Sequence, residues 1–343
     1  MIRRRALALA SAALLLVSSA VFAQGKEQQT RKLSNDEKKE LTAISTMLSG
    51  MTAGQAAPND LGLSWVGSDL LKAQGNKQYV PFSVTVDPSK LTSGKVSFYW
   101  RVVSKDAPAI DPGAKKDDKN KQPTYAFENL HALSVPSGQS GPMRISRSFV
   151  VGAGNYDVFV VAKEPDPKKK GEVAKTGMIK QSITVPDLWN GELNTSSVIL
   201  ATAIDPLPAP LTMAQQEERP YALGNVEIQP AATSKLAKKS ELSVFLLIYN
   251  AKINESNAPD VTVEYSFYAI QNGAEKFFNK TNPQALNAQT LPPGFDPAAG
   301  MTNGQTVPLA SFPEGDYRLE IKITDKLATK SLTREMKFSV SGS

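Results

Sequence analysis

The residue types that most enzymes use for chemistry are scarce in this sequence. Its 343 residues include one histidine, His131, and no cysteine. A Cys–His dyad and a multi-histidine metal site are therefore excluded, and a Ser–His–Asp triad would have to use His131. The sequence has no Gly-x-Ser-x-Gly elbow, no Ser-x-x-Lys, no phosphate loop and no Gly-x-Gly-x-x-Gly fingerprint. We expect His131 on a surface or in a loop, and we expect no catalytic residue.

Carboxylates are the remaining candidates for chemistry. A glycosidase pairs its two carboxylates in space, so a single sequence leaves that arrangement open. A charged loop at residues 105–121 carries four aspartates but also five lysines. Clustered carboxylates can bind Ca²⁺, but the interspersed lysines favour a solvated loop. The sequence therefore predicts neither a metal nor another cofactor.

The tryptophans could serve either as core residues or as platforms for sugar rings. Trp100 lies on a predicted strand with Phe98 on the same face. Immunoglobulin-like sandwiches bury a tryptophan in such a place, so core packing is favoured over a sugar platform. Trp65 and Trp189 lie near predicted domain edges, and the sequence assigns a role to neither of them.

One strand phrase occurs twice, at positions 161 residues apart (315 − 154). Gly154-x-Tyr156 and Gly315-x-Tyr317 each open a run in which every second residue is apolar. That period is typical of a half-buried strand. A tyrosine that follows a glycine turn at a strand start resembles a tyrosine corner, in which the hydroxyl bonds back to nearby backbone. We expect these four residues to be structural: Gly154, Tyr156, Gly315 and Tyr317.

The predicted strands also repeat in order. Strands are predicted in the first half at residues 79–87, 95–103, 144–152, 154–161 and 177–185, and in the second half at residues 241–250, 261–270, 307–312, 315–323 and 331–340. The segment at residues 205–213 is rich in proline and should be extended and unpaired. The sequence thus predicts an all-β chain of two tandem immunoglobulin-like antiparallel β-sandwiches, residues 61–190 and 191–343. The repeated strand order indicates a duplication. The alternative is that two ordinary sandwiches resemble each other by chance.

A short helix should precede the sandwiches, within residues 24–60. Ser34 and Glu37 fit a capping box, and Leu41, Ile44 and Leu48 follow at helical spacing. The helix either packs on the first sandwich or awaits a partner. Packing is favoured, because a helix with a lone apolar stripe is unstable in water.

The first 23 residues resemble a secretory signal peptide. Arg3–Arg5 precede an uncharged stretch, and Val21 and Ala23 give a cleavage site before Gln24. An uncleaved anchor is the alternative. Cleavage would lower the net charge from +6 to 36 − 33 = +3, which argues against nucleic-acid binding. We expect a periplasmic or secreted protein that does not insert into a membrane after cleavage.

Segment 291–301, LPPGFDPAAGM, is an apolar loop between two predicted strands. Its Phe295 either folds down as a strap over its own sandwich or contacts a partner, and the strap is favoured. If Phe295 is a fully buried strap, Phe295→Ala should lower the free energy of unfolding by roughly 3 kcal/mol or more.

Residues 313–340, PEGDYRLEIKITDKLATKSLTREMKFSV, resemble the C-terminal sandwich of large uncharacterised exported proteins of Acidobacteria. Some of those proteins carry von Willebrand-type or GWxTD-type domains. This chain lacks the Asp-x-Ser-x-Ser motif of a von Willebrand A domain, so the resemblance does not imply metal-dependent adhesion and carries over no functional residue.

The sequence favours a non-catalytic exported protein of the bacterial cell envelope. It would bind another envelope or secreted protein or serve a structural role, because loops on a sandwich can vary without harming the core. The alternative is a carbohydrate-binding or carbohydrate-active module. Sugar binding that is lost in Trp65→Ala or Trp189→Ala would favour that alternative.

Overall fold

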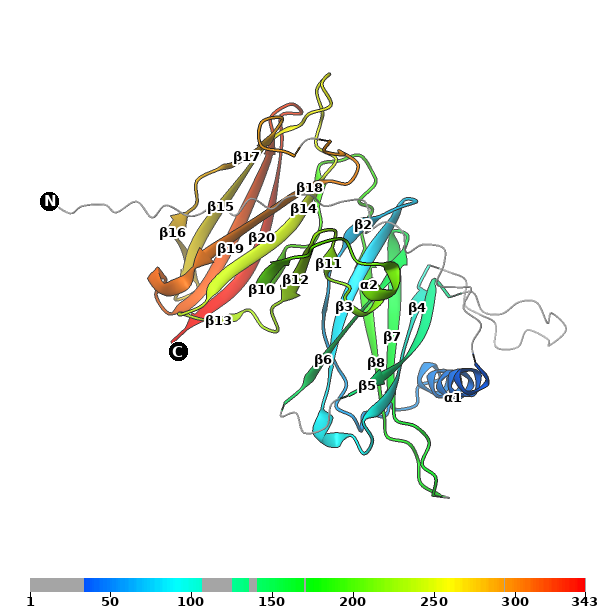
Figure 1. Cartoon of the computed structure of the whole chain (residues 1–343). Coiled ribbons are helices and arrows are strands. Elements are labelled where there is room, and N and C mark those ends of the chain that lie inside the picture. The colour runs from blue at the N-terminus through cyan, green and yellow to red at the C-terminus, as the bar shows by residue number, and fades with distance from the viewer. Residues whose placement is uncertain (1–33, 107–124, 136–140, 170, 293, 343) are drawn as a thin grey trace. The chain divides into compact units, whose positions relative to one another are not determined.

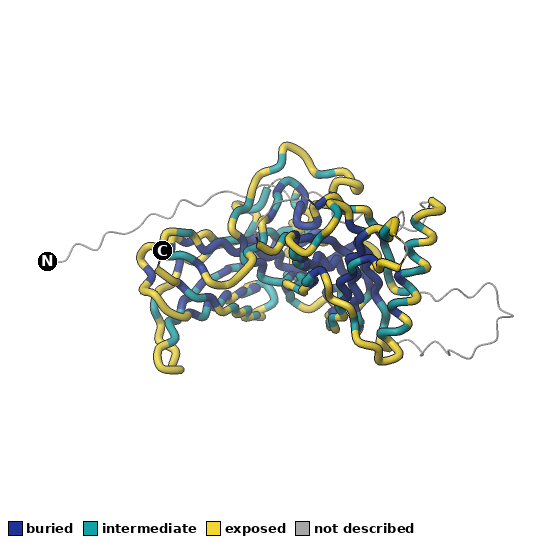
Figure 2. The backbone as a smooth tube through the Cα atoms, turned by 90° about the horizontal axis from the view of Figure 1, so that it is seen from below, coloured by how far each residue is buried: buried dark blue, intermediate teal, exposed yellow. Residues whose placement is uncertain are grey.

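The computed structural model describes residues 34–106, 125–135, 141–169, 171–292 and 294–342 (Figure 1). The chain separates into two compact units between Asp187 and Leu188. Each unit has its own hydrophobic core. Within each unit the buried residues run along the strands, and exposed residues gather at the hairpin tips (Figure 2).

The first unit is a sandwich of two antiparallel sheets. One sheet has the order β1-β3-β2, with β6 also paired to β3, and the other has the order β5-β4-β7-β8. The strands are β1 (Ser64–Ser68), β2 (Leu71–Ala73), β3 (Lys77–Val86), β4 (Lys95–Ser104), β5 (Phe127–Ser134), β6 (Met143–Val151), β7 (Gly154–Lys163) and β8 (Thr176–Val185). The chain crosses from one sheet to the other between β3 and β4, between β5 and β6, and between β6 and β7, which gives the unit an immunoglobulin-like topology.

Alternating residues of these strands fill the first core. The inward side chains include Val80 and Phe82 of β3, Phe98 of β4, and Val158 and Val160 of β7. All five are fully buried. The period of two that the sequence shows is thus the period at which side chains enter the core.

Helix α1 (Asn35–Thr52) packs on the outer face of sheet β5-β4-β7-β8 (Figure 1). The capping box predicted from the sequence is confirmed: the Ser34 side chain accepts from the Glu37 N–H, and the Glu37 carboxylate accepts from the Ser34 N–H. Ile44 and Leu48 are buried against the sheet. The helix therefore docks on its own sandwich.

The second unit is also a sandwich. Its sheets have the orders β11-β12-β10-β14-β18, with β9 paired to β14, and β13-β20-β19-β15-β16, with β17 paired to β15. The elements are β9 (Asn194–Thr195), β10 (Ile199–Pro206), α2 (Met213–Glu218), β11 (Ala222–Leu223), β12 (Val226–Pro230), β13 (Lys235–Ala237), β14 (Glu241–Tyr249), β15 (Asp260–Gln271), β16 (Ala274–Lys280), β17 (Gln284–Asn287), β18 (Met301–Pro308), β19 (Gly315–Asp325) and β20 (Lys330–Ser341).

Five strands occur in the same order in both units. β3, β4, β6, β7 and β8 of the first correspond to β14, β15, β18, β19 and β20 of the second. The first and third strand of each set pair with each other, as do the second and fourth, and the fourth and fifth. The predicted all-β fold of two sandwiches and a short helix is confirmed.

Three details differ from the sequence-based expectation. The strand expected at residues 307–312 is β18, which ends at Pro308 and is followed by a 3-10 turn at Leu309–Ser311. Asp205 and Pro206, expected to be unpaired, close β10 against β12, and Met213 begins α2. The charged loop at residues 105–121 lies almost wholly outside the described residues.

Candidate binding surface

The structure places both Gly-x-Tyr motifs at the start of equivalent strands. Tyr156 Oη donates to the Gly152 carbonyl oxygen at 3.1 Å, and Tyr317 Oη donates to the Pro313 carbonyl oxygen at 2.7 Å. In each case the acceptor is four residues upstream, which is the geometry of a tyrosine corner. Burial raises the pKa of both hydroxyls, so they remain protonated donors.

The glycine before each tyrosine has a backbone that other residues rarely adopt. Gly154 has φ +151° and Gly315 has φ +142°. No atom lies within 4 Å of a β-carbon placed on Gly315, so backbone conformation rather than space requires glycine there. The repeated phrase therefore encodes a turn and its hydrogen bond.

Trp100 lies in the middle of the first core and is 1% exposed. Its indole N–H donates to the Ser148 carbonyl oxygen of the facing sheet at 3.1 Å. His131 is on strand β5 rather than in a loop, and its ring meets Trp100 edge-on with 5.0 Å between ring centroids.

The other aromatic residues singled out by sequence belong to different elements of the two units. Trp65 on β1 stacks on Phe82 with an interplanar angle of 1° and 5.3 Å between ring centroids. One face of the Trp65 ring is therefore covered by the sandwich itself. Phe295 is partly buried and packs against the second core. Trp189 lies one residue beyond Leu188, at which the second unit begins.

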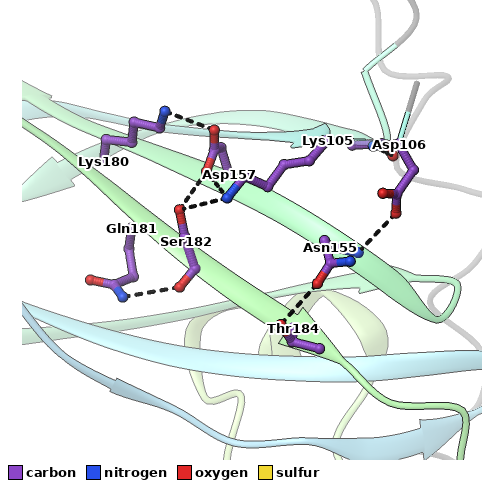
Figure 3. A network of polar contacts seen from close by, with 9 residues as sticks. Lys105, Asp106, Asn155, Asp157, Lys180, Gln181, Ser182 and Thr184 are labelled. Carbon is purple, nitrogen blue, oxygen red and sulfur yellow. Dashed lines mark hydrogen bonds and ion pairs between the residues drawn. The ribbon is translucent and has the colours of Figure 1, made fainter. Parts of the chain in front are cut away.

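A polar network occupies part of the outer face of sheet β5-β4-β7-β8 (Figure 3). Asp157 lies at its centre, 2.7 Å from Lys180 Nζ and 3.6 Å from Lys105 Nζ, and it accepts from Ser182 Oγ at 2.6 Å. Next to it, Thr184 Oγ1 donates to Asn155 Oδ1 at 2.9 Å. Burial acts to raise the pKa of Asp157, but Lys180, Ser182 and Lys105 outweigh it and lower the pKa. The side chains of the network are thus paired with one another.

The matching face of the second unit exposes an aromatic side chain. Phe277 on β16 is 53% exposed, and its ring meets Tyr268 of β15 edge-on with 5.9 Å between centroids. The guanidinium of Arg318 on β19 lies 4.4 Å from the centre of the Tyr268 ring. These three side chains, here called the Phe277 surface, come from three neighbouring strands.

Three glutamates hold Arg318 in place. Its Nε donates to Glu275 at 2.9 Å, and its Nη1 donates to Glu320 and Glu335, each at 2.8 Å. Glu320 and Glu335 lie directly opposite each other on β19 and β20, so Arg318 also relieves a like-charge pair. Hydrogen bonds from Glu275 and Glu320 raise the pKa of Arg318 above its ordinary value.

Sequence reasoning missed the Phe277 surface, although the sequence contains a signal for it. Phe277 and Phe278 are adjacent in a strand, so their side chains point to opposite faces. Phe278 packs against the second core, and Phe277 therefore points outward.

A second missed feature is a polar chain inside the second sandwich. Tyr265 Oη donates to Asn303 Oδ1, and Asn303 Nδ2 donates to Gln284 Oε1 at 2.8 Å. Gln284 Nε2 in turn donates to Gln305 Oε1 at 2.7 Å. Tyr265 is fully buried, and burial raises the pKa of its hydroxyl. This series of hydrogen bonds links strands of the two sheets and fixes how the sheets pack against each other.

Metal and membrane features can be judged for the described part of the chain. There, no three His, Cys, Asp or Glu side chains are grouped so that they could hold a metal ion. Likewise, no helix between residues 34 and 342 that the structure describes is long and apolar enough to cross a membrane.

Comparisons with known proteins give only distant structural matches. No known protein family matches the chain, and no curated protein sequence matches it. An immunoglobulin-like protein from Pseudomonas aeruginosa is 14% identical, covers 42% of this chain over 97% of its own length, and gives a TM-score of 0.21. An Escherichia coli α-2-macroglobulin is 13% identical and gives a TM-score of 0.23. The match covers 77% of this chain and 22% of the length of that protein.

A Salmonella α-2-macroglobulin is also 13% identical and covers 84% of this chain, with a TM-score of 0.20. This chain spans 17% of that protein's length. At such TM-scores the likeness supports no argument about function, and the immunoglobulin-like assignment rests on the strand order described above.

Proposed function

We propose that the chain is a non-catalytic exported protein of the bacterial cell envelope that binds another envelope or secreted protein or serves a structural role there. The observation that carries the binding role is the Phe277 surface. Exposed aromatic side chains and arginine are the residues that contribute most to protein–protein binding.

Within the Phe277 surface, Phe277 is exposed, and Arg318 beside it is held in place by its neighbours. Arg318 is fixed by three carboxylates and by Tyr268, and its side chain is 11% exposed. A side chain that is already ordered loses little conformational entropy on binding. Strands β15, β16 and β19 carry the surface, so a sandwich with its own core supports it.

Export is part of the same proposal. The support comes from the signal-peptide pattern in residues 1–23 and from the resemblance of residues 313–340 to exported acidobacterial proteins. In cells that export the protein, intact mass should place the mature N-terminus at Gln24. A mature protein that retains Met1 would contradict export by cleavage.

Binding is tested by capture from the native envelope, with the full mature protein as bait. Phe277→Ala should lose the captured partner, and its free energy of unfolding should change by less than about 0.5 kcal/mol, as for other exposed sites. Val173→Ala is the matched control, because Val173 is 88% exposed on the hairpin of the other unit. Equal capture by both variants would contradict a role for the Phe277 surface.

The carbohydrate alternative is tested in parallel with a glycan array. Stacking on Phe82 leaves Trp65 at most one ring face for a sugar. Reproducible sugar binding that disappears in Trp65→Ala or Trp189→Ala would replace the proposal of protein binding.

A further inference from the structure

The outer face of sheet β5-β4-β7-β8 is shaped to receive a helix. Five side chains of the sheet form an apolar patch that is buried beneath α1: Tyr99, Leu130, Phe159, Val161 and Met178. The two buried residues of α1, Ile44 and Leu48, contact this patch. The apolar part of the sheet face thus matches two successive turns of one helix.

Polar contacts border the apolar patch. Lys163 Nζ lies 3.2 Å from Glu40 of α1, and the Lys163 side chain is 5% exposed. Arg101 Nη2 donates to Ser45 Oγ of α1 at 3.1 Å.

The contact residues of α1 follow a simple spacing. Glu40, Ile44 and Leu48 are spaced four residues apart and so lie on one side of the helix. Ser45 and the partly buried Leu41, Met47 and Met51 flank them. The sheet face therefore fits a helix with a carboxylate and two aliphatic residues at intervals of four.

Only side chains hold α1 to the sheet. Among the described residues no backbone hydrogen bond joins α1 to a strand. The chain becomes anchored by backbone only at Pro58, whose carbonyl oxygen accepts from the Met178 N–H at 2.8 Å, and at Asp60. Between the end of α1 and Pro58, residues 53–56 are exposed. Gly54 in this stretch has φ +92°, and no atom lies within 4 Å of the place where its β-carbon would be.

The helix also depends on being docked. Four of its hydroxyls bond back to the carbonyl oxygen four residues earlier, from Thr42, Thr46, Ser49 and Thr52. Such residues are poor helix formers, and an isolated helix of this length is marginal in water. Once α1 leaves, the patch is exposed, and an exposed apolar patch of this kind is unusual on a monomer.

We propose that this sheet face is a helix-docking site that takes α1 of a second copy of the chain as well as its own, so that two copies exchange helices. The second copy is the occupant because its α1 offers the same Glu40, Ile44, Ser45 and Leu48 contacts. The exposed segment at residues 53–56 can redirect the helix without breaking a strand pair. Reciprocal exchange gives a closed two-fold dimer.

The first test shortens the connection. Removing Gly54 and Gln55 from the full chain should prevent α1 from reaching its own sheet, so light scattering should show twice the mass of one chain. Adding Leu48→Glu should return the protein to one chain, whereas Thr46→Glu, at an exposed position, should leave the dimer intact. A shortened chain that stays monomeric, or a dimer that Leu48→Glu does not affect, overturns the proposal.

The second test does not depend on the shortened chain folding. A protease site is inserted after Gly54 in the full chain and is cut after folding, and a fluorescent peptide of residues 34–54 is then added. The peptide should replace the resident helix and its anisotropy should rise, with at least ten-fold weaker uptake for Leu48→Glu and unchanged uptake for Thr46→Glu. A folded, cut protein that takes up no peptide overturns the proposal.

Discussion

Glu164 is a carboxylate whose hydrogen bonds make a specific prediction about pH. It lies at the end of β7, is 2% exposed, and accepts from the N–H groups of Thr92 and Ser93 and from Thr92 Oγ1 at 2.6–2.7 Å. Burial acts to raise the pKa of Glu164, but these hydrogen bonds outweigh it and lower the pKa. The ionised form is therefore the one that stabilises the fold.

The stabilisation by Glu164 should disappear in acid. A carboxyl whose pKa is lower in the folded state contributes fully above its unfolded pKa of about 4.3 and loses that contribution as pH falls through the folded value. Glu164→Gln should lower the free energy of unfolding by about 1–3 kcal/mol at pH 7, and the difference from wild type should shrink below about pH 4.

Urea unfolding at a series of pH values measures this difference. Glu172→Gln on the same hairpin is the control, since the Glu172 side chain is 51% exposed and its pair with Lys169 should contribute little. A Glu164→Gln effect that stays constant from pH 7 to pH 3 would contradict the role given to the carboxylate.

Two tyrosine hydroxyls should differ in their value to stability. Tyr317→Phe removes a bond to the carbonyl of Pro313, which is exposed and can be satisfied by water, so it should cost about 0.5–1.5 kcal/mol. Tyr265→Phe leaves the buried Asn303 without its donor and should cost about 1–3 kcal/mol. Thermal unfolding of both variants shows which one loses more stability. A larger loss for Tyr317→Phe would contradict the buried hydrogen bond from Tyr265 to Asn303.

Among the connecting segments, residues 291–301 contribute Leu291, Phe295 and Met301 to the packing of the second core. Phe295 is only partly buried, so Phe295→Ala should cost roughly 1–2 kcal/mol, less than the 3–5 kcal/mol typical of a fully buried phenylalanine. This lowers the value expected from sequence, which assumed full burial. Calorimetry of the variant, together with envelope capture, separates the readings: unchanged stability with weaker capture would make Phe295 a contact residue.

The long elements could be predicted from sequence because each carries its own signal. β19 alternates between Tyr317, Leu319 and Ile321 inside and charged residues outside, and α1 has its capping box and its apolar spacing of four. Strands β9 and β13 span two and three residues, which is too short to show any period. Their partners define them, and partners far away in the sequence leave no local pattern.

The candidate surfaces were harder to predict for the same reason. Adjacent phenylalanines show that Phe277 or Phe278 must face outward, but the choice between them depends on the register of β16 against β15, which contains an irregularity at Phe267/Tyr268. Similarly, no local pattern connects Arg318 with Glu275, because 43 residues separate them. The alternation of residues along a strand predicts which side chains share a face. The register between neighbouring strands decides which of those side chains come into contact.

Across the chain, each of the two units has its own hydrophobic core. The first core draws its residues from positions 61–185 and the second from positions 236–340, with no residue shared. Asn250 Nδ2 of the second unit donates to the carbonyl oxygens of Leu188 and Glu192, so that unit should include the chain from Leu188 onward. The protein is therefore built from two sandwiches with separate cores.

The most direct test is to express residues 24–187 and residues 188–343 separately and to follow their unfolding in urea by circular dichroism and by fluorescence. Each fragment should be rich in β-structure and should unfold in one cooperative transition that coincides for the two probes. A fragment that is disordered, or that unfolds without cooperativity, would show that the two halves share a core and would contradict this organisation.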